Sequence, residues 1–184
     1  MGRPSNREER RRQILAAFAH VLADHGFAGA TVAAIAQEAG VTAGLVHYHF
    51  ESKAELLEAL VAELVRGFRE RVHDREGEGD ALGAYGDAAL ALDERSDRTA
   101  ARCWVGVFAE ALRDPALFRR VRRLIDTELV AIQRRSGDRY DAQEAGAVLA
   151  FVVGSLVVGA FAPQKTAGFA APGLRALLAG LDAA

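Results

Sequence analysis

The sequence TVAAIAQEAGVTAGLVHYHF, residues 31–50, followed directly by ESKAELL, decides the fold of the N-terminal part of the chain. Apolar residues recur three and four positions apart on both sides of Gly40, which is the spacing of two amphipathic helices. Gly40 suits the tight turn between them, because that turn requires a positive φ. The pattern predicts a helix-turn-helix, whose second helix typically lies in the major groove of DNA.

Capping residues define the ends of these helices. Thr31 and Thr42 are placed to N-cap the second and third helices of the chain. Ser52 and Glu55 have the spacing of a capping box and open a long fourth helix, 53–73. A first amphipathic helix is expected from about Asn6 to a glycine cap at His25-Gly26. Ser5 and Glu8 have the spacing of a capping pair at its start.

The rest of the chain shows helical periodicity without strand-like alternation, so we expect an all-α protein of about nine helices. The predicted domains are a helix-turn-helix domain at 1–52, a connecting helix at 53–73 and a C-terminal helical bundle at 74–184. In the C-terminal half, a polar loop at 74–80 precedes a helix through Tyr85, Leu90 and Leu92, and a charged turn follows at 93–98. One helix ends and another begins at Asp114-Pro115, and the second ends at Ser136-Gly137. The next helix begins at a capping pair of Asp141 and Glu144 and is broken at Pro163, and a last helix is expected after Pro172.

Composition excludes several other classes. The 184 residues are 51% hydrophobic and contain one cysteine, Cys103, so the chain is neither disordered nor stabilised by an internal disulfide. The N-terminus lacks the apolar run of a signal peptide, and we expect a cytoplasmic, nucleoid-associated bacterial protein. No phosphate loop, paired metal motif or nucleophile with a base is evident, so no cofactor, metal or enzymatic activity is expected.

Charge is uneven although the net charge is only −2. Residues 1–12 hold five arginines against two glutamates, a local excess of three positive charges. A basic arm ahead of a helix-turn-helix fits phosphate or minor-groove contact, and the alternative is a solvated helix start.

Several residues are candidates for DNA contact. Val46 anchors the recognition helix, and this leaves an outward face of Ala43, Gly44, Leu45 and His47. Tyr48 is expected to reach a phosphate through its hydroxyl group. Lys53 lies in the first turn of its helix, where an isolated cation is disfavoured but a bound phosphate is favoured, and the alternative is an ordinary exposed lysine.

The stretch 145–162, AGAVLAFVVGSLVVGAFA, carries no charge over 18 residues, which is the lower limit for a membrane span. Its many Ala and Gly residues and the absence of flanking aromatic and basic belts favour a buried helix instead. Burial on every side in a chain of this size implies a partner subunit as well as the chain's own core.

A second candidate site lies in the C-terminal half. Trp104 and Phe108 share one helix face, Leu112 continues it, Cys103 flanks it, and Phe151 is positioned on the next buried helix. An aromatic-lined pocket of this kind suits a small molecule, and the alternative is that these residues are ordinary core.

The segment TVAAIAQEAGVTAGLVHYHFESKAELLEALV resembles the N-terminal domain of the TetR family of bacterial repressors, over about residues 7–65. The resemblance implies phosphate contacts at Thr31, Thr42, Tyr48 and Lys53, base proximity at Ala43, Gly44 and His47, and a homodimer on double-stranded DNA with a palindromic operator. His47 stands where family members usually have an aromatic residue, which leaves the His47 contact open.

The segment RCWVGVFAEALRDPALFRRVRRLIDTEL resembles the betaine-regulator subgroup of that family. This resemblance implies a small-molecule effector and a dimer contact on the last two helices, for which the candidate residues are Leu149, Val153, Leu156, Leu174 and Leu178. The expected function is a dimeric repressor released by the effector, with no membrane partner. The competing hypotheses are an enzyme on a helical bundle and an interaction protein without DNA binding.

Overall fold

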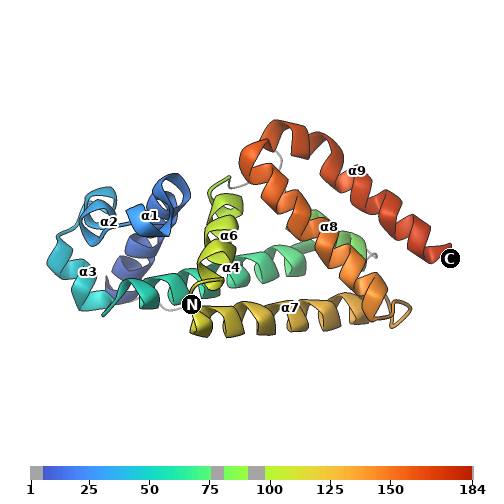
Figure 1. Cartoon of the computed structure of the whole chain (residues 1–184), viewed down its shortest axis with the longest axis horizontal. Coiled ribbons are helices and arrows are strands. Elements are labelled where there is room, and N and C mark those ends of the chain that lie inside the picture. The colour runs from blue at the N-terminus through green and yellow to red at the C-terminus, as the bar shows by residue number, and fades with distance from the viewer. Residues whose placement is uncertain (1–5, 76–80, 91–97, 184) are drawn as a thin grey trace. The chain divides into compact units, whose positions relative to one another are not determined.

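The computed structural model describes residues 6–75, 81–90 and 98–183, and within these ranges it contains nine α-helices and no strand (Figure 1). The all-α prediction is therefore confirmed. The helices are α1 (Asn6–Gly29), α2 (Val32–Glu38), α3 (Ala43–His49), α4 (Lys53–Arg75), α5 (Ala81–Ala89), α6 (Arg98–Ala111), α7 (Pro115–Arg135), α8 (Ala142–Phe161) and α9 (Pro163–Asp182).

The chain divides into two compact units, residues 1–65 and 66–184, so α4 begins in the first unit and ends in the second. In unit 1, α1 packs on α2 and α2 packs on α3. Apolar residues from α1 to α4 are buried in unit 1, and the larger ones include Ile14, Leu15, Phe18, Leu22, Ile35, Val46, Phe50, Leu56, Leu57 and Leu60.

Two glycines of unit 1 have the positive φ that their turns require. Gly40, between α2 and α3, has φ 62°, and the N–H of Val41 donates to the carbonyl of Ala36 across that turn at 2.9 Å. Gly26 has φ 67° and interrupts the helical backbone within α1 at the position predicted as its end. The prediction of a glycine turn at Gly40 is confirmed, whereas Gly26 has a positive φ but does not end α1, which continues to Gly29.

The predicted helix caps are present wherever the structure describes both the capping side chain and the backbone group that it binds. The side chains of Thr31, Thr42 and Asp114 each accept a backbone N–H at the start of their helices. Asp141 and Glu144 form a complete capping box at the start of α8. The pair Ser5 and Glu8 lies partly outside the described residues, as do the predicted loop at 74–80, the turn at 93–98 and Leu92.

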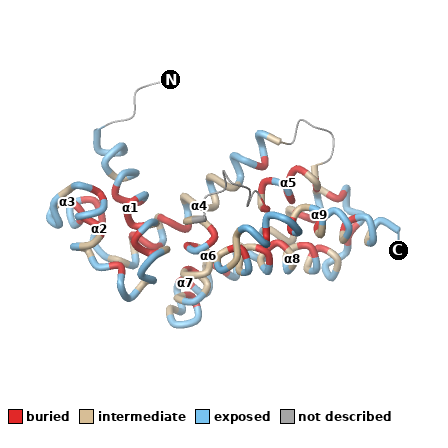
Figure 2. The backbone as a smooth tube through the Cα atoms, turned by 90° about the horizontal axis from the view of Figure 1, so that it is seen from above, coloured by how far each residue is buried: buried red, intermediate tan, exposed pale blue. Residues whose placement is uncertain are grey.

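Unit 2 is built around α8, which packs against α6, α7 and α9 (Figure 1). Its buried side toward these helices carries small and β-branched residues at alternating spacings of three and four, namely Ala145, Val148, Val152, Ser155 and Gly159. Figure 2 shows buried and exposed positions alternating along α8 and α9. Among the described residues, α8 alone is long and apolar enough to cross a membrane by length and composition, and 33% of that window is buried.

The prediction of a last helix starting after Pro172 is wrong. The helix α9 starts at Pro163, and Pro172 lies inside it. An internal proline removes one helical hydrogen bond and costs about 3 kcal/mol. Burial offsets this cost, because the inward residues Thr166, Ala170, Leu174 and Leu178 repeat every four positions on both sides of Pro172.

Candidate nucleic-acid interface

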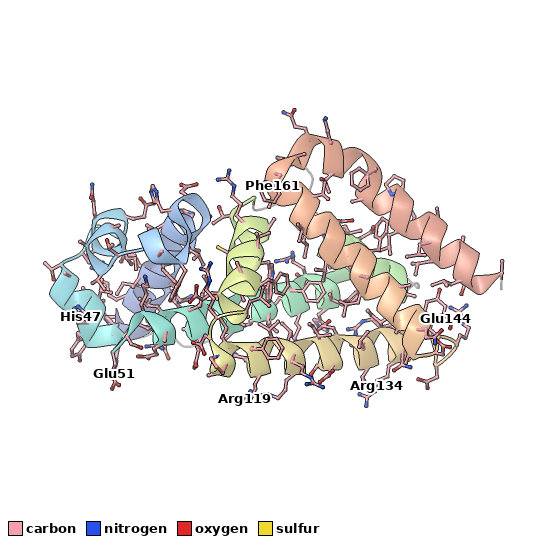
Figure 3. The ribbon with its side chains drawn as sticks, in the orientation of Figure 1. His47, Glu51, Arg119, Arg134, Glu144 and Phe161 are labelled. Carbon is pink, nitrogen blue, oxygen red and sulfur yellow. The ribbon has the colours of Figure 1, made fainter. Side chains whose placement is uncertain are left out.

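The recognition helix α3 is short and presents most of its surface to solvent. Its N-terminus is fixed by Thr42, whose Oγ1 accepts the backbone N–H of Leu45 at 3.2 Å. Only Val46 and His49 are buried, and Leu45 is half-buried. The exposed residues of α3 are Ala43, Gly44, His47 and Tyr48, and Figure 3 shows His47 on its outer edge. The sequence-predicted base-reading residues therefore share an accessible surface, with Leu45 at its margin.

Gly44 has no packing requirement within the chain. A Cβ atom added at this position would have one neighbour within 4 Å, the Oγ1 atom of Thr42 at 3.9 Å. The backbone of Gly44 does not have a positive φ either, since the positive-φ glycines of the described residues are Gly26, Gly40 and Gly137. Close approach of an external surface therefore explains a glycine here better than internal packing does.

Thr31 lies at the start of α2, where its Oγ1 accepts the backbone N–H of Ala34 at 3.1 Å. The residue is exposed, and the same is true of Thr42. Because a hydroxyl group accepts and donates at the same time, each threonine keeps an O–H donor while it caps its helix. Both hydroxyls are thus able to donate to a phosphate oxygen.

Tyr48 is 67% exposed, and its ring lies against polar neighbours rather than in the core. The ring meets His49 edge-to-face at a centroid distance of 5.1 Å, and the Arg7 guanidinium lies 5.8 Å from its centroid. Arg7 belongs to α1, so the first helix borders the ring. The aromatic ring and the arginine together place an O–H donor and a positive charge beside the outer face of α3.

Lys53, the first residue of α4, is half-buried and makes two contacts with the segment before α2. Its Nζ donates to the carbonyl oxygen of Phe27 at 2.6 Å and lies 4.3 Å from the centroid of the Phe27 ring. An ammonium group has three N–H donors, so donation to Phe27 leaves two. Lys53 therefore has a structural role that the sequence did not predict, alongside its capacity to bind an anion.

Two residues of α1 hold the ends of the helix-turn-helix. Gln13 donates from Nε2 to the carbonyl of Ala39 at the end of α2, at 2.7 Å. Arg11 donates from Nη1 to the carbonyl of His49 at the end of α3, at 2.6 Å, and from Nη2 to Oε1 of Glu55 at 3.2 Å. The sequence assigned Arg11 only to a basic arm, because partners 38 and 44 residues away leave no local signal.

The Ser52–Glu55 capping pair is present in an altered form. The backbone N–H of Glu55 donates to Ser52 Oγ at 3.1 Å, as predicted. The carboxylate of Glu55 accepts from the backbone N–H of Glu51, at 2.7 Å. Glu51 lies in the turn after α3 (Figure 3). The hydrogen bond of Glu51 and, more weakly, the Arg11 guanidinium lower the pKa of Glu55 from its ordinary value, while burial opposes the shift.

His49 is a core residue, 7% exposed, and its Nδ1 atom is buried without a hydrogen-bond partner. Burial lowers the pKa of His49 from the ordinary 6.5, and the positive charges of Arg7 and then Arg11 lower it further. The imidazole is therefore neutral at physiological pH. His49 packs behind the exposed face of α3.

In unit 2, Trp104 and Phe108 stack on one face of α6, with ring centroids 5.7 Å apart and an interplanar angle of 28°. Cys103 is fully buried beside them. The ring of Phe151 lies against α9, where a Cβ added to Gly173 would be 2.8 Å from it. Leu112 does not line the predicted pocket, because α6 ends at Ala111 and the Leu112 side chain is 80% exposed.

The predicted dimer residues separate into two groups. Leu174 and Leu178 are buried in the core of unit 2, so they are not available to a partner, and this part of the prediction is wrong. Leu149, Val153 and Leu156 are half-buried on α8. The large apolar side chains exposed on α8 and α9 include Val158, Phe161 and Phe169, of which Phe161 is 78% exposed (Figure 3).

A capped recognition helix with an exposed outer face, held by α1 and flanked by Lys53 and Arg7, defines a helix-turn-helix DNA-binding protein. Residues 14–60 match the family described as bacterial regulatory proteins, tetR family. The chain is 34% identical over 160 residues to the HTH-type transcriptional regulator BetI of Escherichia coli, an alignment that covers 80% of each protein.

Solved structures agree with this assignment. A transcriptional regulator from Rhodococcus superposes with a TM-score of 0.82 at 25% identity and covers 93% of this chain and 95% of its own. A putative transcriptional regulator from Saccharomonospora viridis, solved in complex with choline, has the same fold, with a TM-score of 0.73 at 22% identity and coverage of 93% and 96%. The chain belongs to the TetR family and is a DNA-binding transcriptional regulator.

Proposed function

We propose that the chain acts in the cytoplasm as a homodimer that represses transcription from a palindromic operator and is released by a small-molecule effector. The observation that carries the proposal is the outer surface of α3, where Ala43, Gly44 and His47 are exposed and a Cβ added to Gly44 would meet only Thr42 Oγ1, at 3.9 Å. Small residues allow the backbone of a recognition helix to lie close to base edges. No enzymatic role is proposed.

Phosphate contacts are assigned to the residues that border this surface. Thr31 and Thr42 offer hydroxyl donors at two helix starts, Tyr48 offers an exposed phenol, and Lys53 offers an ammonium group at the start of α4. Such contacts fix the register of a protein on the duplex, and base contacts then supply specificity. Ala43, Gly44, Leu45 and His47 are the proposed base-proximal residues.

Dimerisation is proposed through the outer faces of α8 and α9. The apolar residues proposed to meet a partner are the half-buried Leu149, Val153 and Leu156 and the exposed Val158, Phe161 and Phe169. Large exposed apolar side chains are typical of interaction sites, and a two-fold dimer buries the same surface on both subunits. Two recognition helices related by a dyad would read two half-sites of a palindrome.

The proposed effector site lies in unit 2, beside the stacked rings of Trp104 and Phe108. Both rings are half-buried, which suits a site that combines apolar walls with access from solvent. The choline complex of the Saccharomonospora viridis protein supports a small-molecule ligand for a fold of this type. An effector that binds one conformation of the dimer more tightly would shift operator affinity by that difference.

The proposal is tested by selecting binding sites from random-sequence DNA with the full-length chain. We expect an enriched inverted repeat that the chain retards in a gel-shift assay. The double variant Tyr48→Ala, Lys53→Ala should lose binding, whereas the exposed substitution Lys165→Ala on α9 should not. Enrichment of no sequence, or equal binding by the double variant, would contradict the assignment.

A further inference from the structure

One guanidinium group of α1 makes three contacts at the C-terminal end of the recognition helix. Arg11 donates to the carbonyl oxygen of His49 at 2.6 Å and to Oε1 of Glu55 at 3.2 Å. Its Cζ atom also lies 4.0 Å from the centroid of the Phe50 ring. The first contact fixes the last turn of α3, the second fixes the first turn of α4, and the third covers the residue between them.

Glu55 extends these contacts to the turn itself. Its Oε1 is held by Arg11, and its Oε2 accepts the backbone N–H of Glu51 at 2.7 Å. The carboxylate is thus bridged between a side chain of α1 and the backbone of the turn. Loss of the Glu55 carboxylate would remove both contacts, because one group carries the two.

The recognition helix needs such support because it is too short to be stable alone. α3 has seven residues, and isolated helices below about 12 residues are marginal in water. At the N-terminal end, the Thr42 cap holds it. At the C-terminal end, the buried Nδ1 of His49 has no hydrogen-bond partner, and the Arg11 bond to the His49 carbonyl anchors that turn to α1.

We propose that Arg11 is a positioning residue for sequence-specific DNA recognition, acting with Glu55 to fix the orientation of α3 without touching DNA. The inference rests on the proposed function of α3 as the base-reading helix. Arginine suits the role because its planar group donates to two acceptors in a fork while it lies over an aromatic ring, whereas a lysine ammonium is a compact point charge without that fork.

The competing role is the one that the sequence indicated, a phosphate contact in a basic arm. The two roles make opposite predictions. A lost phosphate contact weakens binding to every duplex and lowers the salt slope by about one unit. A lost positioning contact weakens binding to the cognate site alone, because non-specific binding does not depend on how α3 meets the bases.

Glu55 separates the two roles most sharply. Glu55→Gln removes a negative charge beside the interface, so a purely electrostatic view predicts unchanged or tighter binding to all DNA. The positioning role predicts instead that Glu55→Gln weakens binding to the cognate site, because Arg11 loses its ionised partner.

The experiment compares full-length wild type, Arg11→Gln, Arg11→Lys, Glu55→Gln and the matched control Arg12→Gln, a neighbouring exposed arginine on the same helix. Each is titrated with the duplex that the wild type selects from random DNA and with a scrambled duplex, over a range of salt concentrations. Melting curves restrict the comparison to temperatures at which each variant is folded.

We expect the ratio of cognate to scrambled affinity to fall about tenfold in Arg11→Gln, Arg11→Lys and Glu55→Gln, and to stay unchanged in Arg12→Gln. Affinity for the scrambled duplex and its salt slope should be the same in Arg11→Gln and Arg12→Gln. A retained ratio with a reduced slope in Arg11→Gln, or tighter cognate binding by Glu55→Gln, would overturn the inference. Failure of the wild type to select any site would instead remove the proposed function.

Discussion

The Nζ atom of Lys53 lies 2.6 Å from the carbonyl oxygen of Phe27 and 4.3 Å from the centroid of the Phe27 ring. The start of α4 is thereby joined to the segment that leads into α2. Phe27 lies directly after the backbone break at Gly26, in the last residues of α1, and Lys53 gives its carbonyl oxygen a charged donor. A residue assigned to phosphate binding thus also stabilises the domain that presents it.

Lys53→Met should therefore alter both stability and DNA binding. We expect the free energy of unfolding to fall by about 1–2 kcal/mol, because a charged hydrogen bond and a cation–π contact are lost. The salt slope of non-specific binding should fall by about one unit. Urea titration and gel shifts at several salt concentrations measure the two effects. Lys53→Arg, which retains the charge, should keep the slope, and an unchanged slope in Lys53→Met would remove Lys53 from the phosphate contacts.

Gly44→Ala should weaken DNA binding without lowering stability, unlike Lys53→Met, which should lower both. Alanine fits the free chain, since the one near atom is 3.9 Å from the added Cβ, and it favours a helix by about 0.5–1 kcal/mol over glycine. We expect stability to be equal or higher and affinity for the selected site to be lower. Thermal melting and gel shifts are the two measurements.

Gly40→Ala is the matched control for Gly44→Ala, since it makes the same substitution at a glycine whose backbone does require glycine. Gly40 has φ 62°, so alanine is strained there, and the free energy of unfolding should fall by about 1 kcal/mol. Normal affinity for the selected site in Gly44→Ala would show that the backbone of Gly44 does not approach DNA closely.

The features that the sequence predicted are those with local physical causes. The caps at Thr31, Thr42 and Asp141 and the glycine turn at Gly40 involve groups two to five residues apart, and such pairs are readable from spacing alone. The outward face of α3 followed from helical periodicity around Val46. These features agree with the exposure of Ala43, Gly44, His47 and Tyr48 on α3, and the DNA contacts stay predictions.

The features that the sequence missed depend on tertiary packing. Arg11 and Glu55 are 44 residues apart, and nothing near either residue indicates the other. Leu174 and Leu178 form one apolar face, but periodicity does not say whether the chain or a partner covers it, and here the chain does. Pro172 predicts a helix boundary by local rules, and the buried stripe that spans it overrides those rules.

Burial of His49 predicts a pH dependence of stability. The pKa of His49 in the folded chain is lowered from 6.5, so the unfolded chain binds the proton more tightly. The stabilisation is present above pH 6.5 and is lost as the pH falls below it. Urea unfolding between about pH 5.5 and 7.5 should show stability decreasing toward acid. His49→Leu should flatten this slope whatever its absolute stability, whereas the exposed His73→Gln should retain it.

The exposed Phe161 gives the most direct test of the dimer. With 78% of its surface exposed, its replacement by glutamate costs little in the folded subunit but puts a charge into the proposed interface. Phe161→Glu should shift the chain from dimer to monomer in analytical ultracentrifugation and weaken operator binding, since one head reads only one half-site. Leu112→Glu, at 80% exposure on the turn after α6, is the control and should leave the dimer intact. Dissociation by Leu112→Glu but not by Phe161→Glu would move the interface to the α6–α7 turn.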